Sequence, residues 1–355
     1  MTSAPLEPWQ PDALAVLRQF ANPALTDKPV PLPSILTLAA LQRVQIDGLV
    51  MQGTDRTPLQ RVYDRVWQAQ RRAASRFAGH CAEQQIRNLI FKGADYLERY
   101  FDGRCPSILG DVDVLVERAD LGATRALLYN LGYRQAKFDE ARHALVDADI
   151  ATIAAVEGVH YELYPFCKLE KIELDDDERQ AAQSGTPQPP LFIPEHGEAV
   201  LCVELDVHHG IALDVDIAPL LGRMRASPFR GANALSPADS LWFTCSRLYT
   251  EVALHGKSTL RDFAYMIALL REEQIDWDCL LHACEEYQLR PALFYYLSFV
   301  NALFEQPPIP AAVLAELNPR HGSRMRDWGW QLAKIFDELD PFPQWAALSQ
   351  PARTG

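Results

Sequence analysis

The sequence lacks the patterns that mark several large classes of protein. Its seven cysteines include no CxxC pair and their number is odd, which argues against a disulfide framework or a zinc ribbon and favours a reducing compartment. No run of about 18 apolar residues is free of charge, so we expect no transmembrane helix. The N-terminus has neither the basic start nor the apolar run of a secretory signal. We therefore predict a cytoplasmic protein with no membrane partner.

Positive charge is also scarce. The chain has 34 Lys and Arg against 47 Asp and Glu, which gives a formal net charge of −13. Because an acidic surface repels phosphates, this balance argues against broad nucleic-acid binding, although it allows one local basic site. Hydrophobic residues make up 48% of the 355 residues, enough for a sizeable core without a metal or disulfide.

Hydrophobic periodicity predicts an α+β protein: a small mixed sheet preceded by helices and followed by a helical domain. A long helix is expected over residues 57–85, and four arginines share one stripe of it. That stripe is either a solvated face or an edge that faces phosphates. The expected regions are an N-terminal helical region (1–85), the sheet domain (86–235), a C-terminal helical domain (236–340) and a tail (341–355). The arginines are Arg61, Arg65, Arg72 and Arg76.

Within the sheet domain, short segments with alternating or β-branched residues predict the strands. An acidic, proline-rich stretch interrupts them, and we expect residues 168–198 to form an exposed excursion from a hairpin. The expected strands span 86–91, 111–116, 151–156, 159–166 and 199–208, with a helix over 119–131.

The first chemical signal is the pair Asp111 and Asp113 in the sequence Gly-Asp-Val-Asp-Val-Leu-Val. Residues two apart on a strand project from the same face. Two carboxylates that close repel each other unless a cation neutralises them, and Mg²⁺ prefers such hard oxygen ligands. The pair therefore predicts a divalent metal site, although two aspartates on a solvated strand face would look the same.

Two further segments support the metal interpretation. Lys92-Gly93 follows a predicted strand and opens a helix, a turn in which backbone N–H groups can approach a phosphate. Glu204, Asp206 and His208 share one face of another strand and add carboxylates from a second segment. Three carboxylates can hold two Mg²⁺ ions about 3.5–4 Å apart, enough to activate an attacking oxygen and neutralise a leaving pyrophosphate.

Spacing alone leaves the third carboxylate open. Asp206 is the first choice because it lies on a probable strand in an apolar context, and Glu204 can replace or assist it. Asp214, Asp216 and Glu162 are further candidates. His208 either orients a carboxylate, touches the nucleotide or is a partly buried histidine with a structural hydrogen bond.

Taken together, Lys92-Gly93, Asp111-Val-Asp113, Leu131-Gly132-Tyr133 and Asp206-Val-His208 resemble the bacterial nucleotidyltransferase-like family of the polymerase-beta nucleotidyltransferase superfamily. Leu260-Arg-Asp-Phe263 and Ile275-Asp-Trp277 resemble its C-terminal part, so the resemblance covers roughly residues 35–305. It implies transfer of a nucleoside monophosphate from an NTP to an acceptor, with Mg²⁺ on Asp111, Asp113 and Asp206 and with Glu204 as a further ligand.

The resemblance also implies a nucleotide-binding set, with departures. Ala94 stands where the superfamily's glycine turn usually has a serine, and Ser107 stands where the subfamily often has an arginine. Arg104 is the nearest arginine to that position, and Lys257 and Arg261 begin a helix where superfamily members often contact the triphosphate. The expected nucleotide contacts are Lys92, Gly93, Arg104, Ser107, His208, Lys257 and Arg261.

These features favour a Mg²⁺-dependent nucleotidyltransferase whose acceptor is an unidentified small molecule, peptide or protein. The altered glycine turn keeps a non-catalytic nucleotide-binding or scaffold protein as an alternative. A second alternative is a toxin-like nucleotidyltransferase that modifies a tRNA or a protein. A metal-dependent hydrolase is disfavoured because the sequence has no HExxH or HxH spacing.

Overall fold

The computed structural model describes most of the sheet region and the helices on either side of it in the sequence. The described residues are 10–23, 41–42, 45–50, 57–139, 142, 144–184, 190–194, 198–212, 215–255 and 259–319. The predicted nucleotide contact Lys257, the candidate ligand Asp214 and the predicted tail 341–355 lie outside them.

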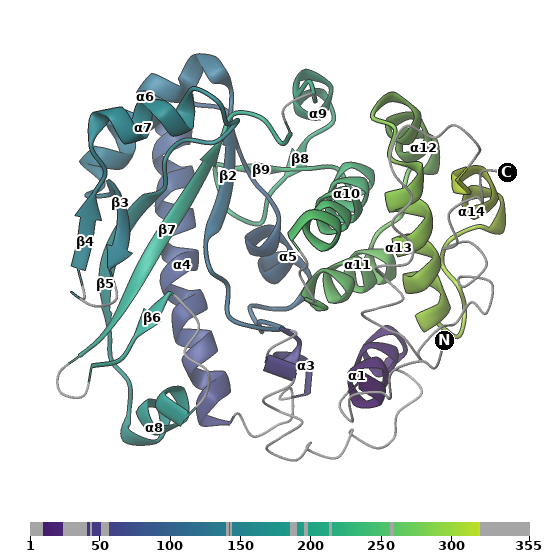
Figure 1. Cartoon of the computed structure of the whole chain (residues 1–355), viewed down its shortest axis with the longest axis horizontal. Helices are drawn as coiled ribbons and strands as arrows, with labels where there is room; N and C mark the ends of the chain where they lie inside the picture. Colours follow the sequence, from purple (N-terminus) through teal and green to yellow (C-terminus); the bar gives the residue numbers. More distant parts are fainter. Residues whose placement is uncertain are drawn as a thin grey trace, which may run out of the picture. The chain divides into compact units, whose positions relative to one another are not determined.

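The chain divides into two units. One unit is Thr54–Ser236, and the other combines Met1–Gly53 with Pro237–Gly355. Figure 1 shows the strands in the first unit and a group of helices in the second. The strands are β1 (Asn88–Ile90), β2 (Val112–Val116), β3 (Arg134–Asp139), β4 (Ala144–Asp147), β5 (Phe166–Ile172), β6 (Leu191–Phe192), β7 (Ala199–His208), β8 (Arg225–Ala226) and β9 (Asn233–Ala234).

Helices of the Thr54–Ser236 unit alternate with these strands. They are α4 (Pro58–Glu83), α5 (Gly93–Tyr100), the short 3₁₀ helix η2 (Arg118–Asp120), α6 (Leu121–Asn130), α7 (Ile150–Glu157), α8 (Asp176–Ser184) and α9 (Ala218–Gly222).

The sheet is mixed, as the sequence predicts, and the fold is α+β. Among the described residues it has nine strands, in the order β4-β3-β5-β7-β2-β1-β9-β8 with β6 paired to β7, so it is larger than the small sheet expected. β2 runs parallel to β7 and β1 runs parallel to β9, whereas the other paired strands are antiparallel. The central strand β7 thus joins the β3–β5 half of the sheet to the β1–β2 half.

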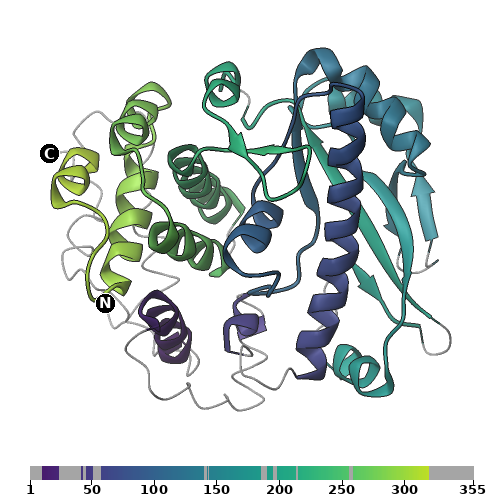
Figure 2. The same ribbon diagram turned by 180° about the vertical axis from the view of Figure 1, so that it is seen from behind.

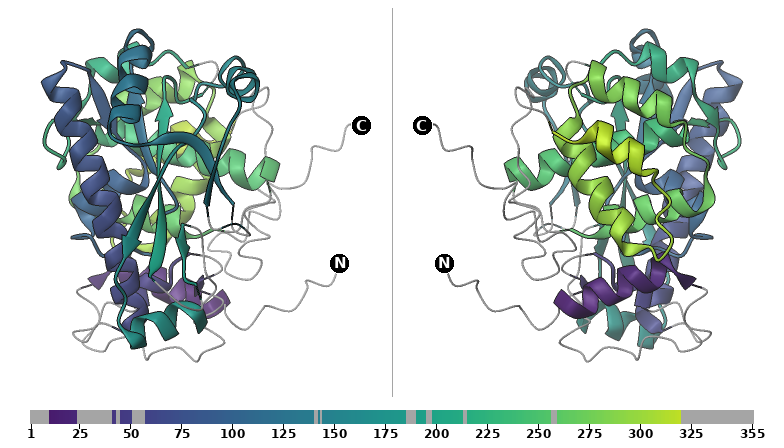
Figure 3. Two further views of the ribbon diagram at one scale, coloured as in Figure 1. Left: turned by 90° about the vertical axis from the view of Figure 1, so that its left-hand side faces the viewer. Right: turned by 90° about the vertical axis from the view of Figure 1, so that its right-hand side faces the viewer.

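Helix α4 runs along one face of this sheet. Figure 2 shows α4 in front of the strands, and the left view of Figure 3 shows α4 beside them. Thr57 caps its first turn by accepting a hydrogen bond from the N–H of Gln60 (3.2 Å), and Pro58 fits the first helical position. Its apolar stripe, including Val66, Trp67 and Phe77, is buried. Burial of this stripe against the sheet stabilises the fold by the hydrophobic effect.

The segment predicted as a strand over 151–156 is the helix α7, so that prediction is wrong. Its run of Ile, Thr, Ala and Val has the composition of a strand, but the Asp149 carboxylate accepts a hydrogen bond from Thr152 N–H (2.7 Å) and caps a helix. α7 has no buried residue, and Ile150 is 87% exposed. Of the strand expected over 159–166, Phe166 is the first residue of β5 and Glu162 forms a single bridge to His208, and the other residues lie outside strands.

Residues 168–172 and 176–184, which the sequence predicts to be part of an exposed excursion, form regular structure instead. β5 continues to Ile172 in antiparallel register with β7, and α8 follows. Asp175 and Glu178 cap this helix reciprocally: Glu178 N–H donates to Asp175 Oδ1 (2.8 Å), and Asp175 N–H donates to Glu178 Oε2 (2.9 Å). The side chain of Glu178 is fully buried against α4.

Two arginines of the α4 stripe bind this buried carboxylate. Arg61 Nε lies 3.2 Å from Glu178 Oε1, and Arg65 Nε lies 2.8 Å from Glu178 Oε2. Farther along the helix, a guanidinium nitrogen of Arg72 lies 3.9 Å from Glu170 Oε2. The interpretation of the stripe as an edge that faces phosphates is therefore wrong for Arg61 and Arg65, which hold α8 instead.

The second unit is helical among its described residues, as the sequence predicts for the segment after Ser236. Helix α11 is apolar almost throughout, with Phe263 and Ile267 fully buried, and Phe263 packs edge-on against Phe299 of α13 with ring centroids 5.0 Å apart. Its helices are α1 (Gln10–Ala21), α3 (Asp47–Val50), α10 (Pro237–His255), α11 (Arg261–Glu272), α12 (Trp277–Glu286), α13 (Arg290–Leu303) and α14 (Ala311–Leu317).

Candidate functional site

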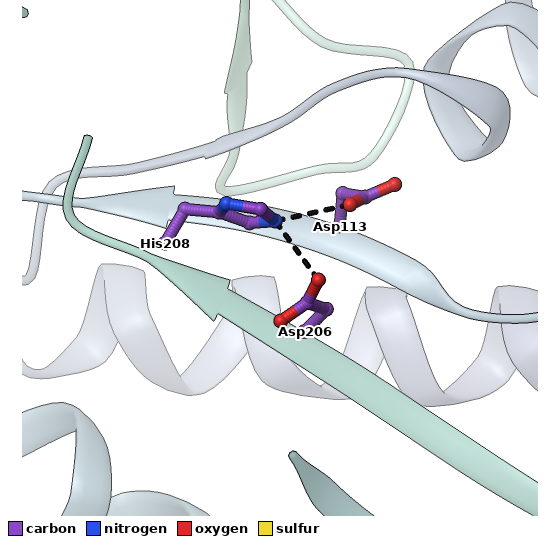
Figure 4. A group of neighbouring side chains, drawn as sticks. All are labelled: Asp113, Asp206 and His208. Atoms are coloured by element: carbon purple, nitrogen blue, oxygen red, sulfur yellow. Dashed lines mark hydrogen bonds and ion pairs between the residues drawn. The ribbon is translucent and has the colours of Figure 1, made fainter. Parts of the chain in front are cut away.

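The parallel pairing of β2 with β7 places the predicted carboxylates side by side. Asp113 pairs with Asp206 in this register, and Val112 pairs with Leu205. One step back along the same register brings Asp111 beside Glu204. Since strand side chains alternate, these four acids lie on one face of the sheet, and Leu205 and Val207 are buried on the other. In Figure 4 the Asp113 and Asp206 side chains lie in front of the strands, and α4 runs behind them.

His208 joins the two aspartates. Its Nε2 lies 3.0 Å from Asp113 Oδ1 and 3.1 Å from Asp206 Oδ2, the two contacts drawn in Figure 4. Its Nδ1 lies 3.3 Å from Glu162 Oε1, in a geometry that makes no hydrogen bond. The ligand atoms of Asp113, Asp206 and His208 lie within 4.8 Å of one another, so this group can hold a metal ion.

The imidazole of His208 is enclosed on both sides. Phe91 packs edge-on against it with ring centroids 5.2 Å apart, and Tyr161 stacks on it at 6.0 Å. Its side chain is 1% exposed. Burial and the neighbouring Lys92 act to lower the pKa of His208, but the hydrogen bonds to Asp113 and Asp206 outweigh them and raise that pKa. The aromatic contacts therefore fix the ring where its Nε2–H can bind both carboxylates.

The pKa of Glu204 reflects the negative charges that gather on this face of the sheet. Burial, together with the negative charges of Asp111, Asp206 and Asp113, raises the pKa of its carboxyl to about 7. The Cys167 thiol, directly across the β5–β7 register, donates a weak hydrogen bond to Glu204 Oε2 (3.7 Å). A cation bound at this face would relieve the repulsion among these carboxylates.

Lys92 lies at the end of β1, where the chain turns into α5. Its ammonium is ion-paired with Asp113 Oδ1 and lies 3.4 Å from His208 Nε2, and its side chain is 14% exposed. It also lies over the Phe91 ring, 5.1 Å from the centroid. Gly93 is the buried first residue of α5. The structure thus brings the Lys92 side chain to the carboxylates that the sequence assigns to the metal.

The other predicted nucleotide contacts are more dispersed. Arg104 is exposed after α5, and Ser107 is buried in the segment that leads to β2. No described contact joins either side chain to Asp113, Asp206 or His208. Arg261 begins α11 in the other unit. Arg104, Ser107, Arg261 and Lys257 stay predictions of the sequence.

Sequence reasoning gave no role to the two rings that hold His208. Phe91 immediately precedes the predicted phosphate turn, and Tyr161 immediately precedes the candidate ligand Glu162. The signal in the sequence that points to Phe91 is its place directly before Lys92-Gly93. In the structure the backbone N–H of Phe91 donates to Asp113 O (3.3 Å). Tyr161 had no comparable signal, because it lies in a loop outside the strands, where the neighbouring Glu162 forms an isolated bridge to His208.

Comparison with known proteins gives the class of the chain. Residues 56–305 match the family described as uncharacterised nucleotidyltransferase, and the chain belongs to that family. No curated protein and no solved structure matches the chain. In the described part of the chain, no helix has the length and apolar character needed to cross a bilayer.

Proposed function

We propose that this protein is a Mg²⁺-dependent nucleotidyltransferase that moves a nucleoside monophosphate from an NTP to an acceptor and releases pyrophosphate. The observation that carries the proposal is the pairing of Asp113 with Asp206 on adjacent parallel strands, with His208 between their carboxylates, in a chain of a nucleotidyltransferase family. The acceptor is a small molecule, a peptide or a protein with a nucleophilic oxygen.

The donor set fits a hard divalent cation. Two carboxylate oxygens converge within 4.8 Å of each other, and Asp111 and Glu204 add negative charge on the same face. We assign Asp111, Asp113 and Asp206 as the metal ligands, with Glu204 able to assist. When bound, Mg²⁺ neutralises the phosphate oxygens and lowers the pKa of the acceptor hydroxyl.

The protein's own groups then carry the proton and hold the reactants. Asp206, whose Oδ2 accepts a hydrogen bond from His208, takes the proton of the acceptor hydroxyl. The acceptor oxygen forms a bond to the α-phosphorus as the bond to the bridging oxygen breaks, and the pyrophosphate leaves with that electron pair. Lys92 and the N–H of Gly93 bind the phosphates, and most of the rate enhancement comes from positioning and charge neutralisation.

Calorimetry with ATP, GTP, CTP and UTP, each with and without Mg²⁺, tests this proposal. We expect at least one NTP to bind only with Mg²⁺, and the Asp111→Asn/Asp113→Asn variant to lose that binding while its near-ultraviolet circular dichroism stays unchanged. Failure of all four NTPs to bind contradicts the proposal. Binding without pyrophosphate release from any acceptor mixture would instead favour a non-catalytic nucleotide-binding protein.

A further inference from the structure

Lys92 has an unfavourable backbone conformation at the centre of the site. Its φ of 55° and ψ of −138° lie in a region that residues with a Cβ rarely adopt. It is also the N-cap of α5, yet its side chain makes no capping hydrogen bond. The side chain extends instead to Asp113 and His208. The strained conformation thus persists where the ammonium reaches the carboxylate cluster.

The Lys92 ammonium is bound to a carboxylate that a metal ion would also need. Lys92 Nζ and His208 Nε2 both contact Oδ1 of Asp113, and Asp113 is one of the three residues of the possible metal group. A lysine ammonium and a divalent cation repel each other at this separation, in a site where the Asp113 side chain is only 6% exposed. The ammonium and a metal ion therefore compete for the Asp113 carboxylate.

We propose that Lys92 is a displaceable counter-ion: its ammonium neutralises Asp113 before the metal arrives, competes with the metal for that carboxylate, and moves to the nucleotide phosphates once the metal is bound. A lysine suits this role because its point charge sits on a flexible four-carbon stem, which lets the charge move while the backbone stays in place. The movement to phosphate rests on the proposed function, whereas the competition with metal does not.

Titration of Mn²⁺ into the full chain without nucleotide tests the competition. We expect Lys92→Met to bind Mn²⁺ at least about tenfold more tightly than the unaltered protein, because the competing charge at Asp113 is gone. The matched control is Lys168→Met, which removes an equal charge whose ammonium donates to Leu131 O (2.9 Å) on the α4 side of the sheet. It should change the Mn²⁺ affinity less than twofold, and Asp113→Asn should abolish binding.

Unchanged or weaker Mn²⁺ binding by Lys92→Met would overturn the proposal. Lys92→Gly provides a second variant, since it removes the ammonium and also suits the positive φ, and it must tighten Mn²⁺ binding in the same way. Agreement of the two variants, with unchanged near-ultraviolet circular dichroism, separates loss of the charge from a change in fold.

Inorganic tripolyphosphate at saturating Mn²⁺ tests the second half of the proposal, because it carries the phosphate chain common to all NTPs. We expect Lys92→Met to bind it at least about tenfold more weakly than the unaltered protein. Equal binding would overturn the movement of Lys92 to phosphate. If the unaltered protein binds neither tripolyphosphate nor any NTP, the proposed function fails, and the Mn²⁺ comparison alone still decides whether Lys92 competes with metal.

Discussion

Glu178 and Glu204 are glutamates of the same unit, and their surroundings shift their pKa values in opposite directions. Burial acts to raise both. At Glu178 the guanidinium groups of Arg65 and Arg61 and the Asp175 N–H outweigh burial and lower the pKa. At Glu204 the neighbouring aspartates add to burial and raise the pKa to about 7. One carboxylate has its countercharge built into the fold, whereas the other belongs to a group whose charges repel.

This difference separates a structural charge from a functional one. A carboxylate held by two arginines stabilises the position of a helix, and its loss should cost stability. A carboxylate among other carboxylates costs stability in the folded protein, and such an arrangement is typical of a site that binds a cation.

The largest effect is expected at the paired aspartates. Asp113→Asn should reduce NTP-dependent pyrophosphate release by about 10³-fold or more, because it removes a charge that the metal and the His208 contact both need. The protein should stay folded by circular dichroism. A folded Asp113→Asn variant with full activity would contradict the assignment of this site.

Loss of the buried carboxylate on α8 should reduce stability and leave nucleotide binding unchanged, whereas loss of Asp113 should reduce activity and leave the fold unchanged. Glu178→Gln should lower the free energy of unfolding by about 2 kcal/mol, because the charged hydrogen bonds from Arg61 and Arg65 are lost. Urea unfolding measures this change. Nucleotide affinity should stay within about twofold of the unaltered protein, and a large loss of affinity would place Glu178 in the site and break the contrast.

In the unaltered protein, acid should remove the contribution that the ionised Glu178 carboxylate makes to stability. Because the pKa of Glu178 lies below its ordinary value of 4.5 in the folded state, its contribution is complete above about pH 4.5 and is lost as the pH falls through the folded-state pKa. Stability should therefore fall less steeply with acid in Glu178→Gln than in the unaltered protein. Parallel stability curves for the two proteins below pH 5 would argue against a lowered pKa.

Removal of one negative charge from the sheet face that carries the four acids should stabilise the protein. Glu204→Gln should raise the free energy of unfolding by about 1 kcal/mol in metal-free buffer at pH 8, because it relieves repulsion from Asp111, Asp113 and Asp206. Thermal unfolding in the presence of a chelator measures the gain. A destabilised Glu204→Gln variant would mean that its hydrogen bond from Cys167 matters more than the repulsion.

The smallest effect is expected at an exposed ion pair that serves as the control for both glutamates. Glu198, whose side chain is 53% exposed, pairs with Lys171, whose side chain is 75% exposed, beside the start of β7. Such pairs contribute little because water screens them. Glu198→Gln should leave the melting temperature and the nucleotide affinity unchanged, and a clear shift in either would show that the glutamate substitutions have an effect that is not local.

The sequence predicts the parts of this site that depend on strand alternation. The expected strand over 199–208 has the bounds of β7, and the expected strand at 111–116 differs from β2 by one residue. Alternation then puts Glu204, Asp206 and His208 on one face. The parallel pairing that brings Asp113 beside Asp206 could not be predicted this way, because register between distant strands depends on tertiary packing.

Predictions failed where local capping outweighed composition. Asp149 and the pair Asp175 and Glu178 begin helices, and both patterns are readable as caps in the sequence. An acidic run was interpreted as a solvated segment, although its last member is buried between two arginines of a helix more than 100 residues earlier in the chain. The backbone conformation of Lys92 has no sequence signal of this kind, because it depends on contacts that form only in the folded site.

The pairing of β2 with β7 has a consequence for how the protein reaches its native state. Asp113 and His208 are 95 residues apart, and β3, β4 and β5 lie between them in the chain. Closing a loop of that length costs entropy before any contact offsets it, so this pairing belongs to the slow, non-local part of folding. During synthesis, the group of Asp113, Asp206 and His208 cannot assemble until the ribosome has released residues beyond His208. We therefore expect metal binding at this group to recover late during refolding.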